Sequence, residues 1–200
     1  YRLYRVDPLK PARADWVEII PEGKDVLEGV GAIGDWLVAD YMHQATSRLR
    51  VFDRDGSFLQ EVSLPTLGTV AGMGGEWDGS EVLFGFQSFT VAPSVYRVDL
   101  AKVKKAAGPV TPVLWDRLKA DIDSSAYTVE QVTYKSKDGT PVTMFLAHKK
   151  GLERTGKNPT LLNAYGGFNI SITPMFGASR FVFLEQGGLI AVPNLRGGGE

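Results

Sequence analysis

The sequence contains no cysteine, and its two histidines, His43 and His148, lie far apart along the chain. The missing cysteines exclude disulfides, thiolate catalysis and cysteine-ligated metals within these 200 residues. Neither histidine has a second histidine or a carboxylate at the helical spacing of metal ligands, so we expect no metal and no cofactor. We interpret both as structural or surface residues, with His148 closing a strand, because a catalytic interpretation needs a constellation of groups.

An excess of charge and a long apolar run are also missing. Lys and Arg number 22 against 23 Asp and Glu, and no basic run occurs. Nucleic acids and anionic membranes both require a basic face, so we expect neither as a partner. No apolar run approaches the roughly 18 residues of a membrane span. Residues 1–7 alternate like a strand, unlike a signal peptide, so we expect the natural N-terminus to lie upstream. A cytoplasmic or, in a bacterium, a periplasmic location stays open.

Short, alternating or β-branched apolar runs fill residues 1–121 and predict an all-β region. The expected strands are residues 2–6, 16–20, 26–33, 36–42, 48–52, 58–62, 69–73, 81–87, 94–99 and 111–115. Related units recur about every 45 residues, a period typical of four-stranded β-propeller blades. Two and a half blades fit before residue 121. The alternative is an ordinary meander or sandwich.

A polar segment at residues 116–125 indicates a domain boundary, which divides the chain into residues 1–121 and 122–200. Beyond it, residues 127–134 and 141–148 predict a hairpin across an Asp-Gly turn. Residues 160–164 form a short apolar run typical of a strand covered on both faces. Residues 188–195 predict another buried strand, in which a proline limits the regular pairing to Val192.

Between these two strands the sequence predicts a helix. Thr173 can cap it, Pro174 suits the first helical position, and Gly187 and Gly188 follow its end. Its packing face is expected to contain Phe176, Phe183 and Leu184. A strand, a helix and a strand in this order predict the start of a parallel α/β sheet.

The segment Tyr165-Gly-Gly-Phe-Asn169 follows the first of these strands. Its glycines, Gly166 and Gly167, let the backbone pass close to a ligand, which a Cβ would prevent. The Tyr165 hydroxyl can donate a hydrogen bond to a developing negative charge at neutral pH. In α/β-hydrolases a loop at this position supplies one oxyanion donor. The alternative interpretation is a core tyrosine beside a strand end.

Residues 158–174 and 187–200 resemble the prolyl oligopeptidase (prolyl endopeptidase) family of serine peptidases, and the resemblance extends to residues 24–28, 82–89, 134–139 and 145–151. It implies the C-terminal blades of a seven-bladed β-propeller, followed by the start of an α/β-hydrolase domain. The implied activity is cleavage of short peptides on the carboxyl side of proline, by a monomeric full-length protein.

The resemblance also implies roles for individual residues. Tyr165 would be the side-chain oxyanion donor, and Phe168 would line the pocket for the substrate proline, although Phe168 could instead be a core residue preceding the helix. Gly166, Gly167 and Asn169 belong to the same loop. In Arg196-Gly-Gly-Gly-Glu200 the glycines indicate a crowded loop beside the site, and we interpret Arg196 as a salt-bridge partner. Ala164 and Pro193 stand where the family often has Gly and Ala.

The sequence has no Gly-x-Ser-x-Gly motif. In this fold the catalytic residues follow in the order Ser, Asp, His, so we expect all three beyond Glu200. The 200-residue chain is therefore expected to be an internal, inactive segment of a larger peptidase. An oligopeptidase B-like or acylaminoacyl-type peptidase of the same fold remains an alternative. So does a non-catalytic propeller module that binds a partner.

Overall fold

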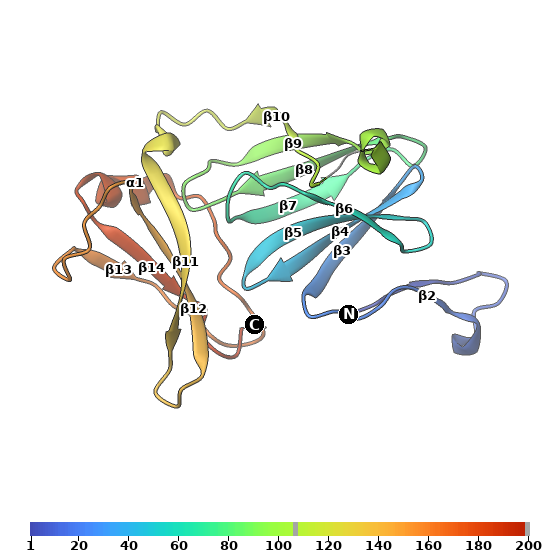
Figure 1. The fold of residues 1–200 in the computed structure, drawn as a ribbon, viewed down its shortest axis with the longest axis horizontal. Coiled ribbons are helices and arrows are strands. Elements are labelled where there is room, and N and C mark those ends of the chain that lie inside the picture. The colour runs from blue at the N-terminus through green and yellow to red at the C-terminus, as the bar shows by residue number, and fades with distance from the viewer. Residues whose placement is uncertain (106–107, 199–200) are drawn as a thin grey trace.

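The computed structural model describes residues 1–105 and 108–198, and its sheets divide the chain into two halves (Figure 1). The first half begins with an antiparallel ribbon of β1 (Leu3–Arg5) and β2 (Val17–Ile20). Two antiparallel meanders follow, each with four strands in sequential order. They contain β3 (Val26–Ile33), β4 (Trp36–His43), β5 (Thr46–Asp53) and β6 (Phe58–Val62), then β7 (Thr69–Gly74), β8 (Glu81–Gln87), β9 (Ser94–Asp99) and β10 (Val113–Arg117). The predicted all-β region and its repeated unit are confirmed.

The two meanders pack against each other through side chains at alternate strand positions. Along β8, Val82, Phe84 and Phe86 are buried, and they share one cluster with Val38 and Val51 of the first meander. Successive residues of a strand point to opposite faces, so this alternation places one face of β8 in the core. The alternating pattern thus decides which face of the strand is buried.

The second half is a four-stranded sheet with the strand order β11-β12-β14-β13. It contains β11 (Tyr127–Lys135), β12 (Pro141–Lys149), β13 (Thr160–Leu162), α1 (Ala178–Glu185) and β14 (Leu189–Pro193), and short 3-10 helices lie at Arg13–Asp15, Leu100–Lys105 and Ser124–Ala126. The β11–β12 pair is the predicted hairpin. β13 and β14 are parallel and flank α1, which confirms the expected order of strand, helix and strand.

The helix prediction was wrong at its N-terminal end. α1 begins at Ala178, after Gly177, and not at Thr173 or Pro174. The preceding segment is bonded to the first half instead: the Thr69 hydroxyl donates to the Pro174 carbonyl at 2.8 Å, and the Phe176 N–H donates to Gln87. These tertiary hydrogen bonds hold the segment outside the helix.

Helix packing and the two flanking strands agree with the predictions in part. Leu184 is buried, and Phe183 and Phe176 pack, partly buried, against the same cluster as predicted, whereas the buried Phe181 was not predicted. β13 ends at Leu162 and is the last strand of the described sheet. It is exposed in the described chain, whereas the sequence predicted a strand covered on both faces. β14 is buried as predicted and extends through Pro193, one residue beyond the expected limit.

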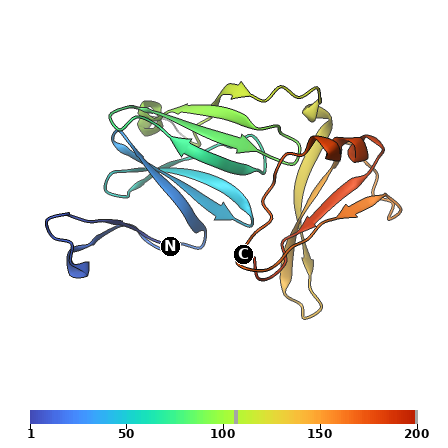
Figure 2. The ribbon, with the colours of Figure 1, turned by 180° about the vertical axis from the view of Figure 1, so that it is seen from behind.

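The two halves meet through a shared apolar cluster. Ala45 and Phe89 of the first half pack with Phe145, Tyr127 and other residues of the second. Across the same contact, the Gln131 side chain donates to the carbonyl of Gln44 at 2.7 Å. Figure 2 shows the two halves from behind, with the C-terminal end of the chain close to where they approach each other.

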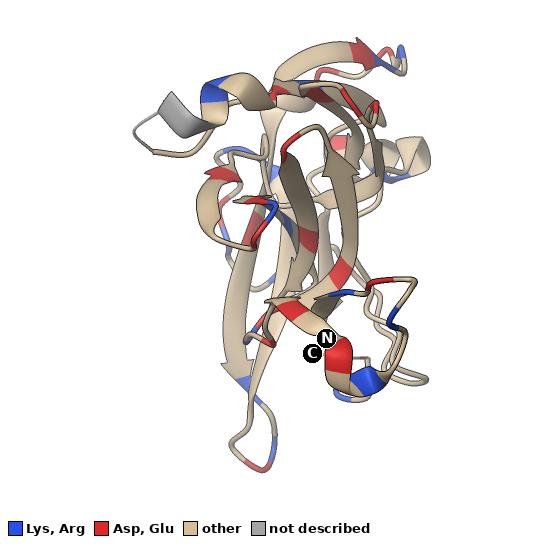
Figure 3. Cartoon of the chain, turned by 90° about the vertical axis from the view of Figure 1, so that its right-hand side faces the viewer, with Lys and Arg blue, Asp and Glu red and all other residues tan. Residues whose placement is uncertain are grey.

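Both signs of charge are distributed along the chain (Figure 3). Within the described part, no helix is long and apolar enough to cross a membrane.

The carboxyl group of Asp40 on β4 is partly withdrawn from solvent. Its Oδ1 atom is buried and has no hydrogen-bond partner among the described residues. Burial raises the pKa of Asp40 to about 7, although a hydrogen bond from Ser47 opposes the shift.

We expect Asp40→Asn to stabilise the full-length protein at pH 8 and to remove a pH dependence. Between the ordinary aspartate pKa of 3.8 and the folded value of about 7, the native state binds more protons than the unfolded state. Stability therefore falls as the pH rises through this window and is constant above it. The expected gain at pH 8 is on the order of 2–3 kcal/mol. Urea unfolding at pH 5 and pH 8 measures it, and an equal effect at both pH values would contradict it.

Candidate oxyanion loop

Tyr165 lies where the parallel strands β13 and β14 end. It forms a parallel bridge with Asn194, one residue beyond β14, and the Asn163 N–H donates to the Ala191 carbonyl at 3.0 Å. Ligand sites of α/β sheets gather at the carboxyl ends of parallel strands. Tyr165 is 44% exposed in the described chain. The structure therefore leaves this phenol accessible beside a strand end.

Phe168 occupies the tip of a tight turn in this loop. The Ile170 N–H donates to the Gly167 carbonyl at 3.0 Å, and Phe168 and Asn169 have φ values of +53° and +58°. Positive φ at both central positions defines a type I′ turn, which non-glycine residues adopt at a conformational cost. Phe168 is 92% exposed in the described chain. The turn presents an aromatic ring on the surface of the described chain.

The backbone of residues 196–198, which follow β14, contacts this loop. The Asn169 N–H donates to the Gly197 carbonyl at 3.0 Å, and the Ser171 hydroxyl donates to the Gly198 carbonyl. A Cβ on Gly166 would lie 2.6 Å from the Arg196 carbonyl oxygen, so any side chain there would displace one backbone from the other. The crowded loop predicted beside the site is present up to Gly198. Gly199 and Glu200 lie outside the described residues.

Arg196 forms the expected salt bridge. Its Nη1 lies 2.6 Å from Asp138 Oδ2, and its Nη2 donates to the Ser136 hydroxyl at 3.2 Å. The hydrogen bond from Arg196 lowers the pKa of Asp138 to about 2. Sequence reasoning placed Asp138 in a hairpin turn and missed this contact. No local signal reveals it, because the two partners are 58 residues apart.

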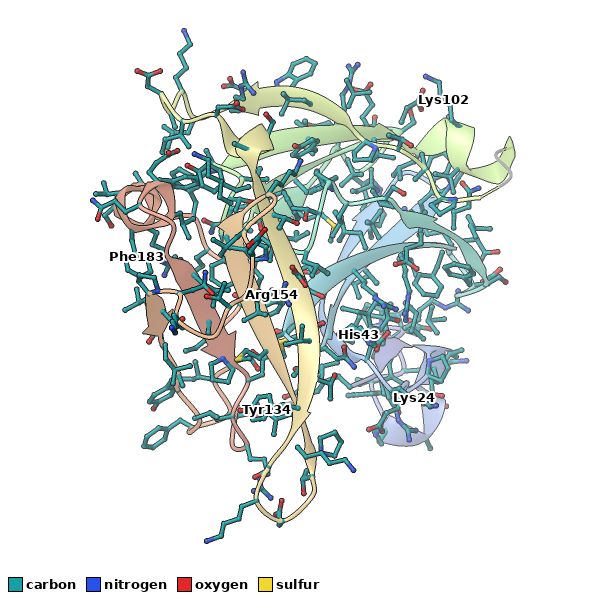
Figure 4. The ribbon with its side chains drawn as sticks, turned by 60° about the vertical axis from the view of Figure 1, so that its left-hand side comes forward. Lys24, His43, Lys102, Tyr134, Arg154 and Phe183 are labelled. Atoms are coloured by element: carbon teal, nitrogen blue, oxygen red, sulfur yellow. The ribbon has the colours of Figure 1, made fainter. Side chains whose placement is uncertain are left out.

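Both histidines pair with carboxylates, in contacts that the sequence did not predict. His43 Nδ1 lies 2.6 Å from Asp25, and the His148 Nε2 atom lies 2.7 Å from Glu130. Burial alone would raise the pKa of Asp25, but hydrogen bonds with His43 and Arg50 lower it. Figure 4 shows His43 where the first meander approaches the β11–β12 hairpin. No three His, Asp or Glu side chains gather as metal ligands in residues 1–105 and 108–198.

A cavity of about 270 Å³ lies between the two halves next to this loop. The residues that line it are Lys24, Asp25, Val26, Met42, His43, Gln44, Ala45, Pro141, Val142, Thr143, Asn194 and Arg196. The Asn194 amide donates to the Thr143 hydroxyl at 2.8 Å, while its Oδ1 is buried without a partner among the described residues. Asn194 thus connects the cavity wall to the bridge with Tyr165.

Successive four-stranded meanders define this chain as a β-propeller type of protein. Residues 1–107 match the family model described as "Prolyl oligopeptidase, N-terminal beta-propeller domain". This match covers more than half of the chain, so the chain belongs to the prolyl oligopeptidase family.

Individual relatives agree with this assignment. The chain is 35% identical over 199 residues to a prolyl endopeptidase of Elizabethkingia miricola, covering all of this chain and 27% of the relative. It is 33% identical over 198 residues to a prolyl endopeptidase of Dictyostelium discoideum, covering 96% of this chain and 25% of the relative. The chain therefore spans about a quarter of the length of these curated relatives.

Solved structures extend the similarity to the fold of the whole chain. A structure from a study of two prolyl endopeptidases superposes with a TM-score of 0.85 at 40% identity, covering 100% of this chain and 28% of that one. Prolyl oligopeptidase B from Galerina marginata superposes with a TM-score of 0.79 at 24% identity, covering 92% of this chain and 26% of that one. The second likeness concerns the fold alone.

Proposed function

We propose that the full-length protein is a serine endopeptidase that hydrolyses short peptides on the carboxyl side of proline, as a monomer and without a cofactor. The observation that carries the proposal is the position of Tyr165: an accessible phenol at the carboxyl ends of two parallel strands, within a Tyr-Gly-Gly-Phe-Asn turn. The relatives named as prolyl endopeptidases support the same activity.

The proposed domain organisation divides the chain near Asp121. Residues 1–121 would be the last blades of a seven-bladed propeller, a proposal supported by the two sequential meanders. Residues 122–200 would be the start of an α/β-hydrolase domain, supported by the parallel pair β13 and β14 with α1 between them. The serine, aspartate and histidine would come from outside these residues, so the 200-residue chain alone would be inactive.

The proposed chemistry is acyl transfer through a serine ester to water. As the serine attacks the peptide carbonyl, negative charge develops on the carbonyl oxygen, and the Tyr165 hydroxyl donates a hydrogen bond to that oxygen. The Cβ position of Gly167 lies 3.4 Å from that hydroxyl, so the donor lies directly beside the backbone of the turn. A donor fixed before the reaction stabilises the charge without reorganisation.

Phe168 would supply the aromatic wall of the pocket for the substrate proline. A flat ring packs well against a pyrrolidine ring, and the type I′ turn holds this ring away from the chain's own core. Gly166 and Asn169 would keep the turn close to the Arg196–Gly198 backbone, through close packing and a hydrogen bond respectively. Arg196 would act on this loop and not on the substrate.

Chromogenic peptides that differ only in the residue before the cleaved bond test this proposal. For the full-length protein we expect kcat/KM for a Gly-Pro p-nitroanilide to exceed that for the Gly-Arg analogue by about 100-fold or more. Preference for arginine would select the oligopeptidase B-like alternative, and preference for an N-acetylated single residue the acylaminoacyl type. Absence of hydrolysis, together with no labelling by a serine-directed fluorophosphonate, would select the binding module.

A further inference from the structure

An exposed ion pair joins the β11–β12 hairpin to the segment that supports Tyr165 and Phe168. The hairpin turn is itself well ordered by hydrogen bonds: the Ser136 N–H donates to the Thr140 carbonyl at 2.8 Å, and the Gly139 N–H donates to the Ser136 carbonyl at 2.9 Å. The Thr140 N–H also donates to Asp138 Oδ1 at 3.1 Å. One carboxylate oxygen of Asp138 is therefore held by the turn, which aims the other, Oδ2, at Arg196.

The guanidinium of Arg196 contacts this turn with two nitrogens. Nη1 donates to Asp138 and Nη2 donates to the Ser136 hydroxyl. The planar guanidinium therefore binds two acceptors of the same turn. Such paired, charge-assisted contacts fix an orientation as well as a distance. The hairpin, whose strands are paired along nine residues, thus anchors Arg196.

The backbone that follows Arg196 carries the contacts to the loop. β14 ends at Pro193, so residues 195–198 have already left the sheet when they reach the loop. From there the Arg196 carbonyl abuts Gly166, the Gly197 carbonyl accepts from the Asn169 N–H, and the Gly198 carbonyl accepts from the Ser171 hydroxyl. Gly197 has a φ of +96°, a conformation that depends on glycine. A segment outside the sheet needs another anchor to support a strained turn.

We propose that Asp138 is a positioning residue for the oxyanion loop and acts through Arg196. The order of contacts is the hairpin turn, the Arg196 guanidinium, the backbone of residues 196–198, and then the turn that carries Tyr165 and Phe168. Asp138 touches no substrate. Its catalytic consequence rests on the proposed peptidase function, whereas its effect on the loop does not.

Asp138→Asn in the full-length protein tests the proposal by two independent measurements. Both partners of the ion pair are more than half exposed, so its loss should leave global stability nearly unchanged. Amide hydrogen exchange at residues 165–171 should become about 3- to 5-fold faster, because the Asn169 hydrogen bond loses its anchored acceptor. With a proline peptide, kcat should fall about 10-fold, because a displaced donor stabilises the oxyanion less well.

Two further variants separate positioning from a general effect of charge. Asp138→Glu keeps the carboxylate and should restore most of kcat and of the exchange protection. Glu153→Gln removes the same charge from an exposed site of the same half and should behave like the wild type in both measurements. Exchange in β12 should be the same in all variants, which reports that the hairpin itself remains folded.

Each outcome decides the proposal. Unchanged exchange at residues 165–171 in Asp138→Asn overturns it, whatever the activity. Exchange that accelerates equally throughout the protein also overturns it, because Asp138 would then serve overall stability. If the wild type hydrolyses no proline peptide but the local exchange increases as expected, the positioning role stands and the proposed peptidase function fails.

Discussion

Tyr165→Phe in the full-length protein is expected to lower kcat for a proline peptide by about 10²–10³-fold and to change KM little. The substitution removes only the hydroxyl, which donates to charge that exists in the transition state and not in the bound substrate. The phenyl ring keeps the same shape beside Gly167, and the backbone bridge to Asn194 is unaffected, so the loop should retain its position. Steady-state kinetics on a Gly-Pro p-nitroanilide measures the effect.

A matched control is available on the same sheet. Tyr134, on β11, is also partly exposed, at 37% against 44% for Tyr165. Figure 4 labels Tyr134 on the hairpin strand. Tyr134→Phe should leave kcat and KM as in the wild type. Unchanged kcat/KM in Tyr165→Phe would remove Tyr165 from the mechanism, and an equal loss in both variants would indicate a general effect of losing a phenol.

Phe145→Ala is expected to reduce the free energy of unfolding by about 3–5 kcal/mol. Phe145 is completely buried on β12 and packs edge-on against Phe89, with ring centroids 5.6 Å apart. Truncation removes apolar surface from the core and leaves a cavity that rigid neighbours on two sheets cannot fill. Because Phe89 belongs to the first half of the chain, the loss affects the contact between the halves as well as the second sheet.

Urea unfolding of the full-length protein, followed by circular dichroism, measures this loss. Phe89→Ala and the double variant complete a cycle, in which the two rings should show a coupling of about 0.5–1.5 kcal/mol. Leu9→Ala serves as the control, because Leu9 is 90% exposed in the loop between β1 and β2 and should cost less than about 1 kcal/mol. A comparable loss in Leu9→Ala and Phe145→Ala would contradict the assignment of Phe145 to the core.

Local patterns predicted most elements of the first half. Residues 26–33, 58–62, 81–87 and 94–99 form strands with the predicted bounds. Antiparallel meanders are formed by neighbours in sequence, so alternation and Asp-Gly turns carry enough information to place them. The same holds for the β11–β12 hairpin, although the hydrogen bond from the Gly139 N–H to the Ser136 carbonyl places Lys137 and Asp138, and not Asp138 and Gly139, at the centre of its turn.

The helix shows where such patterns fail. Thr173 and Pro174 form a good helix start by local rules, yet α1 begins at Ala178. The segment is bonded to Thr69 and Gln87, about 90 to 105 residues away in sequence. A hydrogen bond to another sheet can replace one within a helix, and no short window of sequence contains both partners.

The sequence by itself determined which residues could do the chemistry: a tyrosine and a phenylalanine among glycines, after a strand and before a helix. Tertiary structure alone decided how they are held. It placed Phe168 on an exposed turn and brought the backbone of residues 196–198 into hydrogen-bonding contact with the loop. It also joined Arg196 to Asp138, 58 residues away in sequence. Residue type and local spacing follow from covalent order, whereas support of a loop depends on contacts between segments that only folding brings together.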